Sequence, residues 1–317
     1  MIMMKESPLI SVGIPVYNEE RFLKQTLASI VAIDYPNLEI IIVDNGSTDS
    51  SPDICRTFAS QDPRILYHRE AENRGAIFSW NKTFALSHGK YFFWSGGHDL
   101  WNPQCIALCC NQLEQHRDAV LAFPRTTIIN QEGREIETMN ESSFDSRNLS
   151  AEQRYVFVLR NLDKCNILHG LWRRSSLEGS VLFSSQWGPD VLLIAQMTLR
   201  GSFLSVPEAQ WFRRIVRIPE TQTLRDQRIA QFFNPQISKN AQEAKRILRQ
   251  SKKDSRNAHY MIIRSEVSSL SMRIMLTLLT WYIFAVRQGL YPFSHLSRKI
   301  IRIIPKKWKR KIGLDPH

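Results

Sequence analysis

The fold is decided by the stretch Gly89-Lys90-Tyr91-Phe92-Phe93-Trp94-Ser95-Gly96-Gly97-His98-Asp99-Leu100-Trp101-Asn102-Pro103. Its apolar run Tyr91–Trp94 predicts a strand that is buried on both faces. The run stops at a glycine pair, where the backbone can bend sharply or approach a ligand closely. Ligands of open α/β sheets bind at the carboxyl ends of the strands, so we expect His98 and Asp99 to lie at such a site. The alternative is an ordinary strand-end turn with an aspartate that caps a helix.

Apolar and amphipathic runs alternate on the N-terminal side of this stretch. Strands are expected at Leu9–Val16, Leu38–Val43 and Arg64–His68, and helices at Arg21–Ile33, Pro52–Ser60 and Ala76–Ser87. This β-α-β-α-β-α-β order with short connections predicts an α/β fold with a mainly parallel, doubly wound sheet. Beyond Pro103 the patterns predict strands at Val120–Ile129, Ile167–Arg173, Phe203–Val206 and Ala209–Ile215, and helices at Ala151–Leu162 and Asp190–Leu199.

The net charge of +12 is concentrated at the C-terminus. Ten basic residues and no acidic ones lie between Val267 and Leu314, so the rest of the chain is close to neutral. The N-terminal stretch Met1–Pro8 is too short and too interrupted for a signal peptide, and we expect a cytoplasmic protein. The five cysteines are odd in number and lack a second Cys/His pair at metal-ligand spacing. They are best interpreted as small buried apolar residues.

Residues 220–317 form the second predicted region, which we expect to be helical and basic. The uncharged run Ile274–Val286 is shorter than the ~20 residues that a membrane-spanning helix needs. Arg298–Ile312 mixes isoleucines and a tryptophan with lysines and arginines, which is typical of a helix at the surface of an anionic membrane. We therefore expect peripheral association with the inner membrane face. The alternative is a solvated basic helix packed on the body of the protein.

Several common nucleotide and catalytic motifs are absent from the sequence. There is no Gly-x-Gly-x-x-Gly after the first strand, no P-loop and no Gly-x-Ser-x-Gly elbow. Instead, polar groups follow successive strands, at Tyr17-Asn18-Glu19, Asp44-Asn45-Gly46-Ser47, Asn73-Arg74-Gly75 and His98-Asp99. The carboxyl ends of parallel strands meet at one edge of a sheet, so these groups can line one crevice. Aromatic, acidic and amide groups together suit a nucleotide.

The same motifs, in this order, resemble the family 2 glycosyltransferases with a GT-A fold. The resemblance covers about residues 8–215 and rests on Ile14-Pro15-Val16-Tyr17-Asn18-Glu19-Glu20, Val43-Asp44-Asn45-Gly46-Ser47-Thr48-Asp49, Asn73-Arg74-Gly75 and the Asp99-Leu100-Trp101-Asn102-Pro103 element. It implies one nucleotide-sugar-binding domain at residues 1–219, with a divalent metal, Mn²⁺ or Mg²⁺, at the diphosphate. It also implies transfer of a sugar to an acceptor hydroxyl with inversion.

The resemblance assigns roles to particular residues. Those that match the family's nucleoside and phosphate contacts are Pro15, Tyr17, Glu19, Asp44, Asn73 and Gly75, and those at its metal-binding element are His98 and Asp99. The family's Asp-x-Asp motif reads Gly96-Gly97-His98 here, so its first carboxylate is missing. Imidazole and carboxylate both bind Mn²⁺, so His98 and Asp99 can keep a metal or hold it weakly.

Asp190 matches the family's catalytic base, a carboxylate at the head of a later helix. The acceptor hydroxyl must lose its proton as it attacks the anomeric carbon, and a carboxylate can take that proton. Asp190 also suits a helix cap, and the two roles are compatible. Two weaker candidate groups accompany it: His169-Gly170, Trp172 and Arg173 as an acceptor wall, and Arg213 or Arg214 beside the leaving diphosphate. Both groups are equally well explained as core aromatics with surface arginines.

The resulting hypothesis is an inverting glycosyltransferase that takes a nucleotide-diphospho-sugar, with UDP-sugars favoured, and acts on a saccharide or lipid-linked acceptor in surface polysaccharide or glycolipid synthesis. The alternative is a catalytically weak or inactive nucleotide-sugar-binding protein of the same fold, because Gly96 and Gly97 replace part of the metal motif. A nucleotidyltransferase would need a glycine- and arginine-rich loop after the first strand, which is absent. The basic tail carries no motif that reads nucleic acid, and no nucleic-acid partner is expected.

Overall fold

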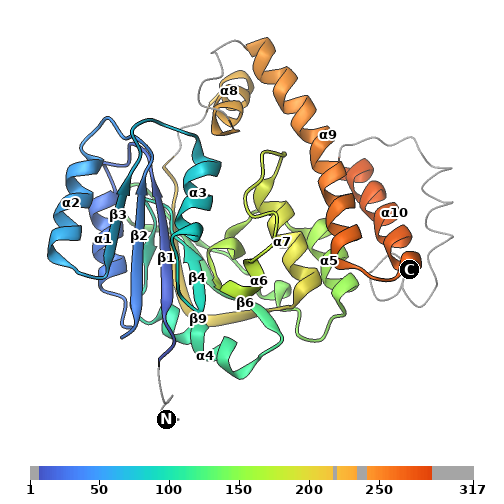
Figure 1. The fold of residues 1–317 in the computed structure, drawn as a ribbon, viewed down its shortest axis with the longest axis horizontal. Coiled ribbons are helices and arrows are strands. Elements are labelled where there is room, and N and C mark those ends of the chain that lie inside the picture. Colours follow the sequence, from blue (N-terminus) through green and yellow to red (C-terminus); the bar gives the residue numbers. More distant parts are fainter. Residues whose placement is uncertain (1–6, 217–219, 234–240, 288–317) are drawn as a thin grey trace.

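The computed structural model describes residues 7–216, 220–233 and 241–287 (Figure 1). The first half of the chain forms the expected parallel strands, which neighbour one another in the order β3-β2-β1-β4. Their bounds are β1 Ile10–Val16, β2 Leu38–Asp44, β3 Ile65–Arg69 and β4 Tyr91–Trp94, and the connecting helices are α1 Leu23–Val31, α2 Ser51–Gln61 and α3 Ala76–Ala85. The carboxyl ends of these four strands therefore meet at one edge of the sheet.

Strand β4 is buried on both faces, as its apolar sequence predicts. Tyr91 and Phe93 join the core that α1, α2 and α4 (Cys105–Gln115) cover. Phe92 and Trp94 join the core on the opposite face, under α3, α5 (Ala151–Asn161) and α7 (Pro189–Arg200). Successive side chains of a strand point to opposite faces, so one apolar run supports both layers.

The second half of the sheet is mixed, and it continues the order as β4-β8-β6-β9-β5. The strands are β5 Leu100–Trp101, β6 Ala119–Ile129, β7 Glu135–Thr138, β8 Leu171–Arg173 and β9 Ser202–Arg214. Strand β8 runs antiparallel to its neighbours β4 and β6, whereas β6 and β9 run parallel to each other. The expectation of a parallel sheet therefore holds for the first half of the chain, and the complete sheet is mixed.

Two strand predictions need correction in this half. The expected strands Phe203–Val206 and Ala209–Ile215 form one strand, β9, whose register against β6 shifts between Pro124 and Arg125. Pro207 has no backbone N–H to donate to the ladder, which accounts for a bulge rather than a break. The expected strand Ile167–Arg173 begins as a 3₁₀ turn over Asn166–His169, and only its last three residues pair as β8.

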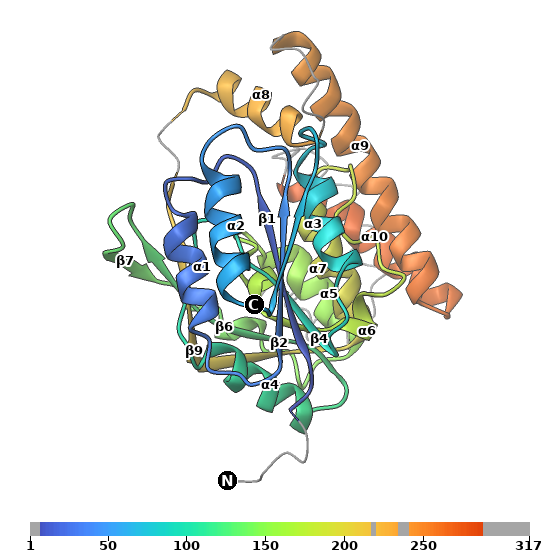
Figure 2. The same ribbon diagram turned by 60° about the vertical axis from the view of Figure 1, so that its left-hand side comes forward.

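Three helices follow β9: α8 Gln222–Phe233, α9 Ala241–Glu266 and α10 Leu270–Arg287. Helices α9 and α10 pack on α5 and α7 around a shared apolar cluster (Figures 1 and 2). Across this interface the Tyr155 hydroxyl and His259 Nδ1 lie 2.9 Å apart, and Arg200 pairs with Glu266 at 2.6 Å. The division of the chain at residue 219 stays a prediction, but the helices beyond it share a core with the sheet domain.

The described ranges contain no helix that is both long and apolar enough to cross a membrane. The basic segment Arg298–Ile312, on which the membrane prediction rests, lies outside the described residues. All five cysteines carry free thiols, and all but Cys165 are buried. Their interpretation as small core residues is confirmed for Cys105, Cys109 and Cys110, which α4 contributes to one core.

Candidate active site

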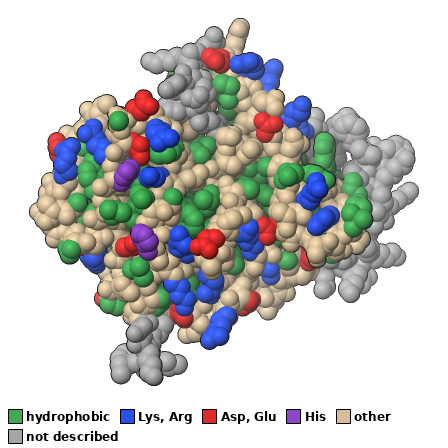
Figure 3. Space-filling model, viewed as in Figure 1, with side chains coloured by type: hydrophobic (Ala, Val, Ile, Leu, Met, Phe, Trp, Pro, Cys, Tyr) green, Lys and Arg blue, Asp and Glu red, His purple; other side chains and the backbone are tan. Residues whose placement is uncertain are grey.

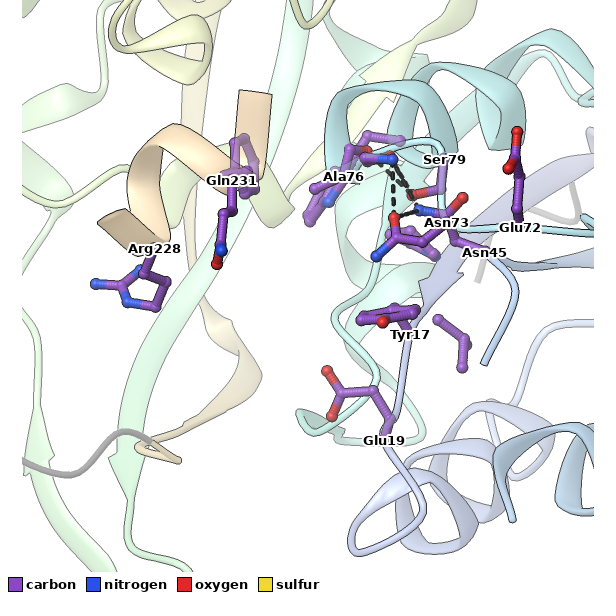
Figure 4. A pocket seen from close by; sticks show the side chains of 14 residues that line it. Tyr17, Glu19, Asn45, Glu72, Asn73, Ala76, Ser79, Arg228 and Gln231 are labelled. Carbon is purple, nitrogen blue, oxygen red and sulfur yellow. Dashed lines mark hydrogen bonds between the residues drawn. The ribbon is translucent and has the colours of Figure 1, made fainter. Parts of the chain in front are cut away.

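A cavity of about 780 Å³ lies at the carboxyl ends of β1 and β2, beside the N-terminus of α3 (Figure 4). Five of the residues predicted to contact the donor nucleotide line it: Pro15, Tyr17, Glu19, Asn73 and Gly75. The opposite wall comes from α8, through Arg228, Gln231 and Phe232. Figure 4 shows Arg228 and Gln231 across the cavity from Tyr17 and Glu19. The strand-end crevice expected from the sequence is therefore present, and it has a second wall that the strand-end motifs do not reveal.

Asn45 holds the floor of this first cavity together. Its Nδ2 donates to Asn73 Oδ1 at 2.9 Å and to the Gly75 carbonyl at 3.0 Å, and its Oδ1 accepts from the Arg74 N–H. Gly75 has a φ of 89°, a conformation that favours glycine, and it caps α3. The Asn45 side chain is almost wholly buried. One buried amide therefore ties the turn after β2 to the loop that begins α3.

The turn after β1 is fastened to the turn after β2 in the same way. Asn18 has a φ of 52°, and its backbone N–H donates to Ser47 Oγ at 3.0 Å while its Oδ1 accepts from Thr48 N–H. The Glu19 N–H donates to Ser51 Oγ at 2.9 Å. Tyr17 precedes this anchored turn and stays 44% exposed. Its ring thus lies at the cavity and remains partly accessible to a ligand.

Asp44 is fully buried and does not line this cavity. One carboxylate oxygen accepts from the Ser47 N–H at 2.8 Å, and the other lies 2.9 Å from the Tyr67 hydroxyl and 3.2 Å from Arg69 Nε. Burial and the Asp44 carboxylate raise the pKa of Tyr67, so its hydroxyl stays protonated and donates. The structure gives Asp44 a role in shaping the turn, and its predicted contact with the base remains a prediction.

A second cavity of about 530 Å³ adjoins the first, and Asp190 lines it. Gly188, with a φ of 68°, and Pro189 begin α7, so Asp190 stands in the first turn of that 12-residue helix. Acidic side chains are common in the first turn of a helix, where the free backbone N–H groups lie. The side chain is half-buried. The candidate base is therefore an accessible carboxylate at a helix N-terminus, as the sequence predicts.

His169 also lines the second cavity, and its imidazole is held in one orientation. Nδ1 lies 3.0 Å from the Trp94 carbonyl, which can only accept, so Nδ1 carries the proton and Nε2 is an acceptor. The ring stacks on Trp211 with a centroid distance of 4.4 Å. Burial is the largest cause of a lowered pKa at His169, so the ring is neutral at pH 7. Of the candidate acceptor wall only His169 lines this cavity, since Trp172 is in the core and Arg173 donates to backbone carbonyls of the sheet domain.

The predicted metal element lies outside both cavities. His98 Nδ1 is 3.1 Å from Glu19 Oε1, and the buried Asp99 accepts from the Arg214 N–H at 3.0 Å. A Cβ at Gly96 would lie 2.8 Å from Asp99 Oδ2, and one at Gly97 would lie 2.8 Å from Glu19 Cγ. The chain's own side chains thus fill the space into which a first carboxylate of the motif would project.

The residues present do not fit a divalent metal. Among the residues described, no three or more His, Cys, Asp or Glu side chains gather in a way that could hold a metal ion. His98 and Asp99 are each engaged by a different neighbour, Glu19 and the backbone N–H of Arg214. The prediction of Mn²⁺ or Mg²⁺ at His98 and Asp99 is therefore not supported by the geometry of these residues.

The two candidate arginines of β9 have different roles. Arg214 is buried, and its guanidinium donates to the carbonyls of His98, Asn130 and Gln131, which makes it structural. Arg213 lines the second cavity and donates to Asn166 Oδ1 at 2.7 Å. Helix α8 adds Arg225 and Arg228 to the same cavity. No motif in the sequence points to these two arginines, because α8 lies far along the chain in a polar segment without a strand-end motif.

Comparisons with known proteins agree with this architecture. Residues 11–178, more than half of the chain, match the family model described as glycosyl transferase family 2. The putative teichuronic acid biosynthesis glycosyltransferase TuaG of Bacillus subtilis is 31% identical over 128 residues, which is 40% of this chain and 50% of TuaG. The matched regions span half or less of the length of the curated relatives compared.

Two solved structures share the fold at low sequence identity. S. aureus TarS 1-349 in complex with UDP-GlcNAc is 13% identical with a TM-score of 0.55, covering 95% of this chain and 92% of that one. The mannosyltransferase PcManGT from Pyrobaculum calidifontis, in complex with GDP-Man and Mn²⁺, is 18% identical with a TM-score of 0.51, covering 94% and 86%. At these identities the likeness establishes the fold and leaves ligands to be argued from this chain's own residues.

Proposed function

This chain belongs to glycosyl transferase family 2, and from that premise we propose that it transfers a sugar from a nucleotide-diphospho-sugar to an acceptor hydroxyl with inversion at the anomeric carbon. One observation carries the proposal: the Asp190 carboxylate lines a cavity that adjoins, and shares a wall with, the strand-end cavity. The first cavity offers an aromatic ring, amides and carboxylates to a nucleoside. The second offers a base to an acceptor.

The proposed reaction is a single displacement. The acceptor O–H gives its proton to Asp190 as its oxygen attacks the anomeric carbon. The bond between that carbon and the diphosphate oxygen breaks on the opposite side, and its electron pair leaves with the nucleoside diphosphate. His169 Nε2, an acceptor in a neutral ring, is placed to accept from a sugar hydroxyl in the same cavity.

The donor and acceptor classes rest on similarity. UDP-sugars remain the favoured donors from the sequence resemblance, and the two solved structures that share the fold hold UDP-GlcNAc and GDP-Man, so they do not choose between these nucleotides. A polysaccharide acceptor is favoured because the relative TuaG is named for teichuronic acid synthesis. The alternative is a nucleotide-sugar-binding protein without turnover, and it rests on the glycines Gly96 and Gly97 that replace part of the metal motif. The presence of Asp190 beside the donor cavity favours catalysis.

The test is turnover by the purified full chain with a panel of UDP-, GDP- and dTDP-sugars, in EDTA and in Mn²⁺. Release of one nucleoside diphosphate, by hydrolysis or by transfer to an added acceptor, is the expected result and identifies the donor. Nucleotide binding without release in the presence of saccharide and lipid-linked acceptors would favour the binding-protein alternative. Absence of any nucleotide binding would refute both.

We further propose that the outer surface of α9 and α10 contacts an anionic membrane. Tyr260, Leu270 and Ile274 are about half exposed or more and line a shallow cavity together with Arg264 and Arg273. Trp281 is 58% exposed under the Arg256 guanidinium, at 5.6 Å. Figure 3 shows hydrophobic and basic side chains mixed over this end of the molecule. Apolar groups flanked by arginines suit an anionic lipid surface, and the positive charge disfavours both a second copy and the chain's own basic tail.

Sedimentation with phosphatidylcholine vesicles, with and without phosphatidylglycerol, tests this surface. The double variant Ile274→Ser/Trp281→Ser should bind anionic vesicles less than the wild type does. Ile136→Ser, which changes an equally exposed apolar residue on β7, is the matched control and should bind like the wild type. The assignment would be refuted if the double variant bound anionic vesicles as well as the wild type does. It would also be refuted if the wild type bound neutral vesicles as well as anionic ones.

A further inference from the structure

The two cavities meet at a shared wall, and that wall carries one charged residue. Trp80, Arg228 and Phe232 line both cavities, whereas the carboxylates Glu19, Glu72, Asp163 and Asp190 each line only one. A nucleotide-diphospho-sugar with its nucleoside in the first cavity and its sugar beside Asp190 must place its diphosphate between them. Resting on the function proposed above, we propose that Arg228 binds this diphosphate, with Arg225 and Arg213 beside it, in the role that a divalent metal has in metal-dependent transferases.

The orientation of Arg228 supports this role. Its ion pair with Glu220, at 2.5 Å, uses Nε and Nη2 of the guanidinium. The Nη1 group takes no part in that pair, so it can donate to phosphate oxygens without the pair breaking. A guanidinium is always charged and presents its donors in a planar fork that matches phosphate oxygens. Glu220 thus holds the side chain of Arg228 in place at the shared wall.

Two more arginines stand on the transfer side of the wall. Arg225 lies one helical turn before Arg228 on α8, and Arg213 comes from β9 and is oriented by its hydrogen bond to Asn166 Oδ1. As the bond from the anomeric carbon to the diphosphate breaks, negative charge grows on the leaving oxygen. Fixed cations aimed at that oxygen stabilise the transition state more than the ground state.

The geometry of the predicted metal-binding residues, His98 and Asp99, also favours arginines at the diphosphate. His98 and Asp99 line neither cavity, and the Asp99 and Glu19 side chains fill the space beside Gly96 and Gly97. The positions that would carry carboxylate ligands in a metal-dependent relative are thus occupied by contacts internal to this chain. Three arginines, drawn from α8 and β9, supply positive charge where the diphosphate must pass.

Titration calorimetry with uridine and UDP, and with GDP as an alternative nucleotide, tests the proposal on the full chain in EDTA and then in Mn²⁺. Wild-type protein should bind UDP more tightly than uridine in EDTA, and Mn²⁺ should change the UDP affinity little. Arg228→Gln should weaken UDP binding roughly 10-fold and leave uridine binding unchanged, since one charge-assisted contact is lost. Arg228→Lys keeps the charge but loses the planar fork of donors, so its affinity for UDP should lie between those of the wild type and Arg228→Gln.

Arg249→Gln is the matched control, because it removes the same charge from an exposed position on α9. It should bind both ligands like the wild type. If the wild-type protein binds UDP only in Mn²⁺, this inference is overturned and the proposed function still stands. The comparison of EDTA with Mn²⁺ on the wild type decides this without any variant. An equal loss of UDP and uridine binding in Arg228→Gln would also overturn it. If uridine, UDP and GDP all fail to bind, the proposed function falls with it.

Discussion

The two cavities are built in different ways. The first is lined mainly by residues from the first 80 positions, which follow neighbouring strands. Hydrogen bonds between adjacent turns join these residues. The second collects residues from the 3₁₀ turn before β8, the head of α7, the end of β9 and helix α8. The strand-end side of the first cavity can form as soon as the parallel strands pair, and α8 supplies its opposite wall. The second needs the C-terminal helices, because α9 and α10 hold α5 and α7 in place.

Because the two cavities are built from different segments, nucleoside binding and sugar transfer should respond to different substitutions. Under the proposed function the first cavity holds the nucleoside, whereas transfer also needs the second. Substitutions in the strand-end turns of the first cavity should therefore change affinity, whereas substitution of Asp190 in the second should change turnover. Changes in the packing of α9 should affect the second region before the first.

The largest expected effect comes from Asp190→Asn. The amide cannot accept the acceptor proton, so kcat should fall roughly 10²- to 10⁴-fold, which is the range for removal of a general base. The affinity for UDP, measured by calorimetry, should not change, because Asp190 lines only the second cavity. A parallel loss of UDP affinity would contradict the division between the two regions.

A smaller effect is expected from acid pH, through His259 on α9. Burial lowers the pKa of His259 from 6.5 to about 4 in the folded protein. Below pH 6.5 the unfolded chain takes up a proton that the folded chain does not, so the free energy of unfolding falls as pH drops from 6.5 to 4. The full difference is about 3 kcal/mol. Urea unfolding at pH 7 and pH 4.5 measures it.

His259→Gln should flatten this pH dependence, whereas a variant of the exposed His88, His88→Gln, should keep the wild-type slope. Hydrogen exchange at pH 5 should show α7, α9 and α10 losing protection before β1 and β2. Equal slopes for His259→Gln and the wild type would contradict the assignment of this pH dependence to His259. Simultaneous loss of protection in all five elements would show that the two regions unfold as one cooperative unit.

The smallest effect is expected from Tyr17→Ala. The ring is 44% exposed at the first cavity, so its loss should cost roughly 1 kcal/mol of UDP binding, which is at the low end for an aromatic ring stacked on a base. Stability should stay within about 0.5 kcal/mol of the wild type, as for most surface substitutions. Tyr260→Ala, at a similarly exposed tyrosine on α9, is the control for UDP binding. Unchanged UDP affinity in Tyr17→Ala would remove the stacking role.

The sequence predicts the first region better than the second for a physical reason. Strands of a parallel sheet carry their loops to one edge, so a polar residue after an apolar run has a known position. That rule located Tyr17, Glu19, Asn73 and Gly75. It also pointed to Asp44, His98 and Asp99, which the structure places outside both cavities. Position at a strand end does not say whether a side chain faces the cavity or its own turn.

The second region depends on contacts between distant segments. Asp190 was found through a family motif, because a carboxylate at a helix head is otherwise an ordinary cap. Arg225 and Arg228 lie in a polar helix whose spacing gives no hint of what it covers. Only the packing of α8 beside α3 and α9 brings them to the wall of the site.

The wall that the two cavities share has a consequence for steady-state kinetics. A donor that spans both cavities puts its sugar against Asp190, and the acceptor must then lie over the anomeric carbon and close the remaining access. Substrates should consequently add in a fixed order, donor first and acceptor second, with the nucleoside diphosphate released last. Such a sequence makes the nucleoside diphosphate a competitive inhibitor towards the donor and a noncompetitive one towards the acceptor, so product accumulation slows the enzyme even when acceptor is plentiful.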